Sequence, residues 1–316
     1  MLRSSVLAEL LVLIIIVTYA YVIPSSILSF AQNSGDISDN NSLRGSLLMV
    51  QEGIAYSSTL EEAHSMKLEI MTEYFLDSDN DEILVDNGLT LGHLSLDEIE
   101  GAYFLKFSML KILKISKDFT TIVFHGSAWQ NSDNAKRISS TDAWVTVSGR
   151  ITYNEPINLR DKSVTTMISE KSNIQINIRD NSGQLMKLSS KGPMNGRVST
   201  NILPSPSEIQ GKSFILETAN GDKFKVYATD PEAIQLLIDN YYGLNNMFVM
   251  GRLVIGDGGF NSPWSWHLDP DHVTMAEFAI ELCDGTPSEV EHNLPYWLFQ
   301  VETFCPWSSK VIEIGP

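Results

Sequence analysis

Short runs in which apolar and polar residues alternate constrain the fold of this chain more than any other feature. In Ile174–Ile178 (IQINI) the isoleucines share one face, and a turn sequence follows at 180–183 (DNSG). Alternation with a period of two is typical of a half-buried strand. Similar runs occupy residues 46–55, 67–75, 120–126, 143–153 and 184–188. Short strands separated by turns predict a mainly β domain over residues 43–200, either an antiparallel sandwich or an antiparallel barrel.

The sequence pattern changes after a linker at 201–210 that contains two prolines. Strand patterns at 212–218 and 223–228 meet at Asn220-Gly221, a strong hairpin signal. Asp230-Pro231 then supplies an N-cap and a first-turn proline for a helix. Further strands are expected at 247–255, 274–283 and 310–314, and a second helix is expected from the capping-box sequence at 286–289. The order β-β-α-β-loop-β-α-β predicts an α+β domain over residues 211–316.

The N-terminal residues predict export from the cytoplasm. An apolar run, Leu10–Ile23, follows Arg3 and ends at Pro24, and small residues occupy positions 29 and 31. This pattern is that of a signal peptide, with an uncleaved membrane anchor as the alternative, over residues 1–31. A polar stretch at 32–42 is expected to be a disordered tether. We therefore expect a secreted protein or one on the extracellular face of the membrane.

Export determines how the two cysteines are interpreted. Cys283 and Cys305 are the only cysteines of the chain, and an even number in an exported protein predicts a disulfide. The bond would link the end of one predicted strand to a segment beyond the second predicted helix. The expected fold class is therefore a mainly β N-terminal domain followed by a disulfide-stapled α+β domain.

The charge of the chain disfavours one class of partner. With 39 acidic and 22 basic residues, the formal net charge is −17 at pH 7. A negative surface repels phosphate backbones, so nucleic acid is not expected as a ligand. An unknown extracellular or cell-surface partner is expected instead, with membrane contact only through an uncleaved N-terminal segment.

The stretch from Gly251 to Asp284 concentrates the unusual residues of the chain. The main hypothesis is a binding or structural protein without catalytic activity. Under this hypothesis Arg252 and Glu281 form a buried ion pair, because a buried guanidinium requires an anionic partner. The aromatic side chains that would form a core or a ligand platform beside the disulfide are Trp264, Trp266 and Trp307.

Two alternatives assign chemistry to the same stretch. His267, Asp269 and Asp271 have period-two spacing, so in an extended segment they would share one face and could bind calcium or a transition metal. A hydrolase could use His267 as a general base, with Glu281 or Asp269 orienting the ring. The serines Ser262 and Ser265 lack the GxSxG sequence of a nucleophile elbow. A metal remains possible on this interpretation, and no other cofactor is expected.

Several motifs carry a family resemblance. They are Phe260-Asn261 with Pro263-Trp264, Trp266 to Pro270 (WHLDP), Ala279 to Asp284 (AIELCD) and Cys305 to Trp307 (CPW). With these motifs, residues 211–316 resemble an exported prokaryotic domain that is labelled by analogy as calmodulin-binding-protein-related. The resemblance implies an exported fold unit without an assigned activity. Calmodulin itself is an unlikely partner, because it binds basic amphipathic helices and both predicted helices carry acidic residues without Lys or Arg.

Overall fold

The computed structural model describes residues 43–58, 62–76, 89–97, 102–114, 120–129, 144–166, 171–179, 183–190, 194–203 and 211–315. The predicted signal peptide or anchor at 1–31 and the predicted tether at 32–42 lie outside these residues. Within the described ranges, none of the helices combines the length and the hydrophobicity that a membrane span requires.

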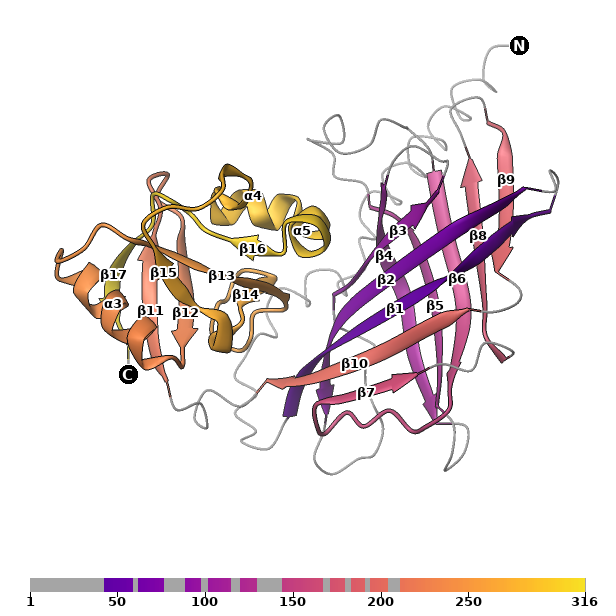
Figure 1. The fold of residues 1–316 in the computed structure, drawn as a ribbon, viewed down its shortest axis with the longest axis horizontal. Helices are drawn as coiled ribbons and strands as arrows, with labels where there is room; N and C mark the ends of the chain where they lie inside the picture. The colour runs from indigo at the N-terminus through magenta and orange to yellow at the C-terminus, as the bar shows by residue number, and fades with distance from the viewer. Residues whose placement is uncertain are drawn as a thin grey trace, which may run out of the picture. The chain divides into compact units, whose positions relative to one another are not determined.

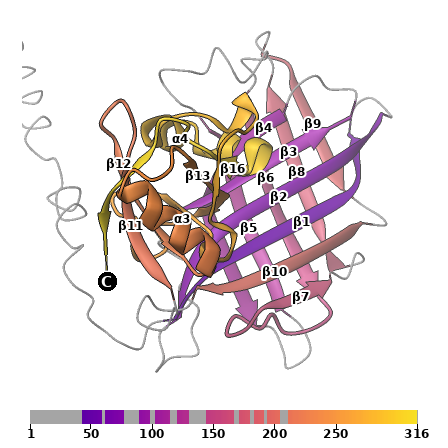
Figure 2. The same cartoon turned by 60° about the vertical axis from the view of Figure 1, so that its left-hand side comes forward.

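Eight strands of the described chain form an antiparallel barrel (Figures 1 and 2), which confirms one of the two β architectures expected from the sequence. The barrel closes because β1 pairs with β2 along most of its length and with β9 at its end, from Ala55 to Ser57. The strands are β1 (Leu43–Ser57), β2 (Ala63–Leu76), β3 (Thr90–Leu96), β4 (Ala102–Lys114), β5 (Thr120–Ala128), β6 (Trp144–Tyr153), β8 (Asn173–Arg179) and β9 (Leu185–Ser190).

Two further strands extend the sheet from β1. The first part of β1 pairs with β10 (Asn195–Leu203), and β10 pairs in turn with β7 (Ser163–Thr166). Thr200 on β10 holds β7 and the turn before it, because its hydroxyl bonds to the carbonyl of Asp161 at 2.8 Å and to Ser163 Oγ at 2.9 Å. The side chains of β10 and β7 therefore lie in fixed positions beside β1.

Alternating apolar residues fill the barrel interior. Ile174, Ile176 and Ile178 on β8 are buried, whereas the residues between them are exposed or half-buried. Phe107 packs close to Gly92 and Gly126 on the neighbouring strands, and a Cβ atom at Gly126 would lie 2.8 Å from its ring. The alternation in the sequence thus identified the inward face, and glycine provides space for the larger rings.

The α+β region begins with the predicted hairpin. Strands β11 (Lys212–Glu217) and β12 (Lys223–Ala228) meet at a turn in which Gly221 has φ = 88°, and β17 (Lys310–Ile314) pairs with β11. Helix α3 (Pro231–Tyr241) follows, with the Asp230 side chain accepting a hydrogen bond from the backbone N–H of Ala233. The predicted N-cap is confirmed.

The second sheet of this region is organised around β13 (Phe248–Ile255), which pairs with β14 (Trp266–Leu268), β15 (Thr274–Ala276) and β16 (Thr303–Phe304). The prediction of a strand at 274–283 is wrong beyond Ala276. Pairing with β13 stops there, and Glu281–Cys283 forms the 3₁₀ turn η3. The remaining helical turns are η2 (Pro270–His272), α4 (Pro287–His292), α5 (Leu294–Tyr296) and the π-helical turn η4 (Trp297–Val301).

The disulfide between Cys283 and Cys305 is present, as predicted. Both cysteines are buried, and the backbone N–H of Cys305 donates to the carbonyl of Cys283 at 2.8 Å. The capping box of α4 is also confirmed, because Thr286 and Glu289 exchange side-chain to backbone hydrogen bonds. The fold class predicted from the sequence is therefore confirmed in both its parts.

Candidate ligand-binding site

His267 lies in the interior of the α+β region. It is fully buried on β14, and its Nδ1 bonds to the carbonyl of Gly256 at 2.7 Å. Burial lowers the pKa of His267, so the ring is neutral and donates this hydrogen bond from Nδ1. Its ring packs edge-on against Phe260. A histidine sealed in this way fixes the glycine-rich loop and does not reach a substrate.

The three residues of the predicted metal site diverge. Asp269 is buried and caps η2, whereas Asp271 is exposed and accepts a hydrogen bond from Thr229 Oγ1 at 3.0 Å. The shared face predicted with His267 is lost because extended pairing ends at Leu268 and Pro270 begins a 3₁₀ turn. No group of three His, Cys, Asp or Glu side chains in the described part of the chain is arranged to hold a metal ion.

The predicted buried ion pair between Arg252 and Glu281 is wrong. Arg252 is half-exposed and pairs with Asp269, which also bonds to Nδ1 of His272 at 3.0 Å. Glu281 is exposed on η3 because the strand that would have carried it ends earlier. Burial opposes ionisation of Asp269, but the hydrogen bond and charge of Arg252 hold its pKa below the usual range.

The three tryptophans do not form one platform. Trp266 is fully buried and packs against Phe304, so it belongs to the hydrophobic core. Trp264 is half-buried and donates from Nε1 to the carbonyl of Lys223 at 2.8 Å. Trp307 is exposed and packs on Phe248. The spacing of Trp264 and Trp266 thus marks core packing, and Trp307 lies on a separate surface.

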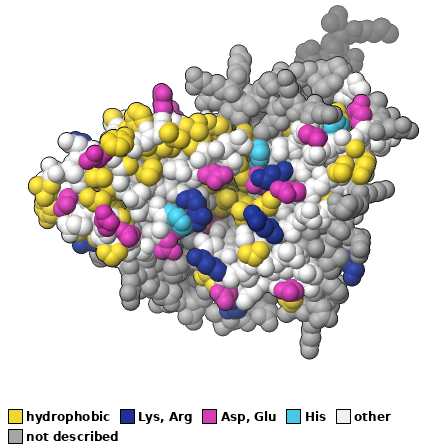
Figure 3. All heavy atoms as spheres, viewed as in Figure 1, with side chains coloured by type: hydrophobic (Ala, Val, Ile, Leu, Met, Phe, Trp, Pro, Cys, Tyr) yellow, Lys and Arg dark blue, Asp and Glu magenta, His cyan; other side chains and the backbone are white. Residues whose placement is uncertain are grey.

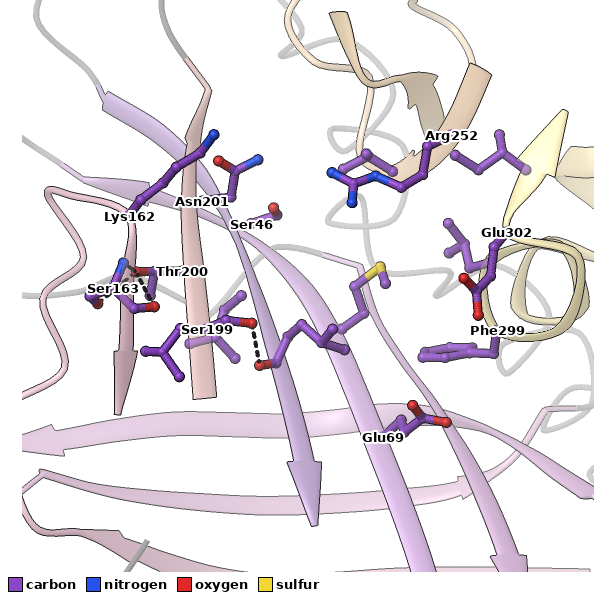
Figure 4. A pocket seen from close by; sticks show the side chains of 17 residues that line it. Ser46, Glu69, Lys162, Ser163, Ser199, Thr200, Asn201, Arg252, Phe299 and Glu302 are labelled. Carbon is purple, nitrogen blue, oxygen red and sulfur yellow. Dashed lines mark hydrogen bonds between the residues drawn. The ribbon is translucent and has the colours of Figure 1, made fainter. Parts of the chain in front are cut away.

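A half-open cavity of about 480 Å³ offers a different candidate site (Figure 4). Figure 3 shows basic and acidic side chains gathered around a hollow in the molecular surface. A volume of this size is within the range of sites for small ligands. The lining residues come from β1, β2, β7, β10, β13, η4 and the residues next to them: Ser46, Leu47, Leu48, Glu69, Met71, Lys162, Ser163, Val164, Ser199, Thr200, Asn201, Arg252, Leu253, Val254, Leu298, Phe299 and Glu302.

The charged groups of this cavity lie on different elements. Figure 4 shows Lys162 on one side and Arg252 and Glu302 on the other, with Glu69 on the sheet between them. Glu69 is already paired, with Lys67 at 2.9 Å and with Nδ1 of His93 at 3.3 Å. Burial opposes its ionisation, but these hydrogen bonds and charges lower the pKa of Glu69, so the carboxylate stays charged.

Glu302 is held in the cavity wall by an unusual backbone. It is the one non-glycine residue with positive φ among the described residues, at 61°. Its N–H donates to the carbonyl of Trp297 at 2.7 Å and ends the π-helical turn, while its own carbonyl accepts from the N–H of Leu253 at 2.9 Å. Both π-helical turns and left-handed non-glycine residues concentrate at functional sites. The geometry therefore singles out Glu302, which no sequence motif indicated.

These observations define a class of architecture, an antiparallel β barrel followed by a disulfide-linked α+β region, with a cavity lined by both. The α+β region is also similar to a known family of N-terminal domains, whose model matches residues 211–316. The name of that family is calmodulin-binding-protein-related, which agrees with the resemblance inferred from the sequence motifs. No curated protein and no solved structure matches the chain.

Proposed function

We propose that this is an exported binding protein without catalytic activity, and that its ligand occupies the cavity lined by Arg252 and Glu302. One observation carries the proposal: opposite charges lie on adjacent rigid elements of one cavity wall. In the β13–β16 ladder, Arg252 is the partner of Thr303, the residue that follows Glu302. Charged groups held by backbone hydrogen bonds are oriented before a ligand binds, which lowers the cost of binding.

The chemistry of the lining supports a small zwitterionic ligand such as a short peptide. A guanidinium binds a carboxylate through two parallel hydrogen bonds, and the Glu302 carboxylate can accept from an amine. On the opposite side, Ser199 and Asn201 offer hydroxyl and amide groups, and Phe299 adds an apolar surface. Such a mixture of apolar surface and a few polar groups is typical of ligand pockets.

Two features support export. The apolar run at 10–23 follows a basic residue and ends before small residues, as signal peptides do. The disulfide is consistent with an oxidising compartment, because such bonds are rare in the cytosol. Absence of catalysis is proposed because His267, the residue best suited to acid–base chemistry in the stretch 251–284, is sealed in the core.

Thermal-shift and calorimetric titrations of the full chain test the ligand proposal, with the dipeptide Ala-Ala, its acetylated amide and a neutral disaccharide as probes. We expect Ala-Ala to raise Tm and the blocked dipeptide to have little effect. Glu302→Gln and Lys162→Gln should each weaken binding at least tenfold. Glu313→Gln, at an exposed position on β17, is the matched control and should leave it unchanged. Equal binding by the blocked peptide, or by the cavity variants, would refute the proposed ligand class, and hydrolysis of Ala-Ala would refute the absence of catalysis.

A further inference from the structure

Three large apolar side chains project from the segment between β15 and α4. Phe278 is 83% exposed, Ile280 is 70% exposed and Leu282 is 53% exposed. Trp307, which follows the second cysteine, is 44% exposed. We call these four residues the apolar ridge. Exposed single apolar residues are common on proteins, but several in one short stretch mark an interaction surface.

The disulfide holds the ridge in place. It joins the segment that carries Leu282 to the one that carries Trp307. The backbone N–H of Trp307 donates to the Asp284 carboxylate at 2.9 Å, and the Trp307 ring packs on Phe248 with 6.3 Å between centroids. A stapled surface loses little conformational freedom when a partner binds. The exposure is therefore a built feature of the α+β region.

The side chain between two ridge residues points inward. Ala279 is half-buried and packs with the disulfide and Phe248, whereas Phe278 and Ile280 on either side of it are exposed. The ladder between β15 and β13 stops at Ala276, and the hydrogen bonds of the 3₁₀ turn begin at the Ile280 carbonyl. Residues 277–279 thus have the alternation of a strand but lie outside the sheet, which is the arrangement that strand-addition partners use.

The charges around the ridge determine which partner fits. Glu277 and Glu281 are both exposed beside it, and the whole chain carries a net charge of −17. Antiparallel pairing of two copies about Ala279 would place Glu277 opposite Glu281, and like charges directly opposite each other destabilise a strand pair. Anionic lipid headgroups would be repelled in the same way. A second copy and an anionic membrane are therefore disfavoured.

We propose that the apolar ridge docks a partner protein through a segment in which apolar side chains alternate with Lys or Arg. The apolar side chains would cover Phe278 and Ile280, and the basic ones would pair with Glu277 and Glu281. This surface is independent of the cavity proposed above. It takes a basic, extended segment, whereas the cavity takes a small zwitterion.

The probe is a fluorescent peptide of alternating leucine and lysine, titrated into the full chain purified with its disulfide intact. We expect Phe278→Ser with Ile280→Ser to weaken binding at least tenfold, and Glu277→Lys with Glu281→Lys to do the same. The matched controls are Leu244→Ser, which removes another apolar side chain that is 74% exposed, and Glu313→Lys on β17; neither should change binding. All of these side chains are exposed, so the variants are expected to fold.

Several outcomes would overturn the proposal. Equal losses in the ridge variants and in the controls would show that the peptide binds the acidic surface in general. Equal binding of a leucine–glutamate peptide would remove the role of charge. Binding to phosphatidylcholine vesicles without peptide binding would assign the ridge to a lipid surface, and a dimer that the ridge variants abolish would assign it to a second copy. Binding of Ala-Ala in the cavity should stay unchanged in every ridge variant.

Discussion

Glu73 provides the sharpest test of the structure, because its carboxyl group is buried without compensation. It lies on β2 with 8% exposure, and its Oε1 has no hydrogen-bond partner among the described residues. Gly256 packs directly against this carboxyl group, and Asp257 lies nearby, paired with Arg44 at 2.9 Å. Burial, reinforced by the charge of Asp257 and opposed by that of Arg44, raises the pKa of Glu73 from 4.5 to about 7.

The sign of the effect on stability follows from this direction. Between pH 4.5 and 7 the folded protein holds a proton that the unfolded chain has released, so the free energy of unfolding falls as pH rises. Glu73→Gln replaces the carboxyl with a neutral group of the same shape and removes this dependence. With pKa values of 4.5 and about 7, its stability relative to the wild type should rise by roughly 3 kcal/mol between pH 4 and pH 8.

Urea denaturation of both proteins, followed by tryptophan fluorescence at pH 4, 5, 6, 7 and 8, measures this difference. The glutamine amide can add a constant offset by burying a new donor, so the change with pH is the quantity to compare. Glu52→Gln, at an exposed position on β1, is the control for general charge effects. A pH-independent difference between wild type and Glu73→Gln, or one that decreases toward pH 8, would refute the buried, proton-binding carboxyl.

Three other predictions concern the α+β region. Replacing Cys283 and Cys305 by serine should lower the free energy of unfolding by about 3 kcal/mol, given their separation of 22 residues, as measured by urea denaturation against the oxidised wild type. Glu302→Gly should change the stability by less than about 1 kcal/mol, whereas Glu302→Val should lower it by roughly 1–3 kcal/mol, because the position has positive φ. Asp269→Asn should cost about 1–3 kcal/mol at pH 7 by leaving Arg252 without its charged partner. Since the pKa of Asp269 is lowered, its charge stabilises the fold above pH 3.8, and this cost should vanish as the pH falls below that value.

Local patterns predicted much of the fold because they report local physics. The isoleucines of 174–178 face the barrel interior as their alternation indicated, and Asn220-Gly221 forms the turn of a hairpin. Asp230 and Thr286 cap their helices because a side-chain oxygen there satisfies a free backbone N–H. What alternation alone could not decide was sandwich against barrel. That depends on β1 being long enough to pair with β2 and with β9.

The candidate site could not be read from the sequence, because its residues meet only in the folded chain. Lys162, Ser199, Arg252 and Glu302 belong to separate elements, and no spacing connects them. The hypotheses drawn from the sequence instead selected His267 because histidines near acids are often functional. In the structure its burial and its bond to Gly256 show that it serves the glycine-rich loop. Glu302 gave no signal, because the sequence does not reveal a left-handed backbone at a non-glycine residue.

The wrong strand prediction at 274–283 is the most informative error. Its alternation is real, since Ala279 packs inward while Phe278 and Ile280 point outward. The missing element is a neighbouring strand beyond Ala276. A sequence pattern records which face a segment must cover, but it does not say whether the cover belongs to the same chain. In this protein the disulfide holds the uncovered segment in place, and the exposed face of Phe278 and Ile280 is the surface for which we propose a basic partner.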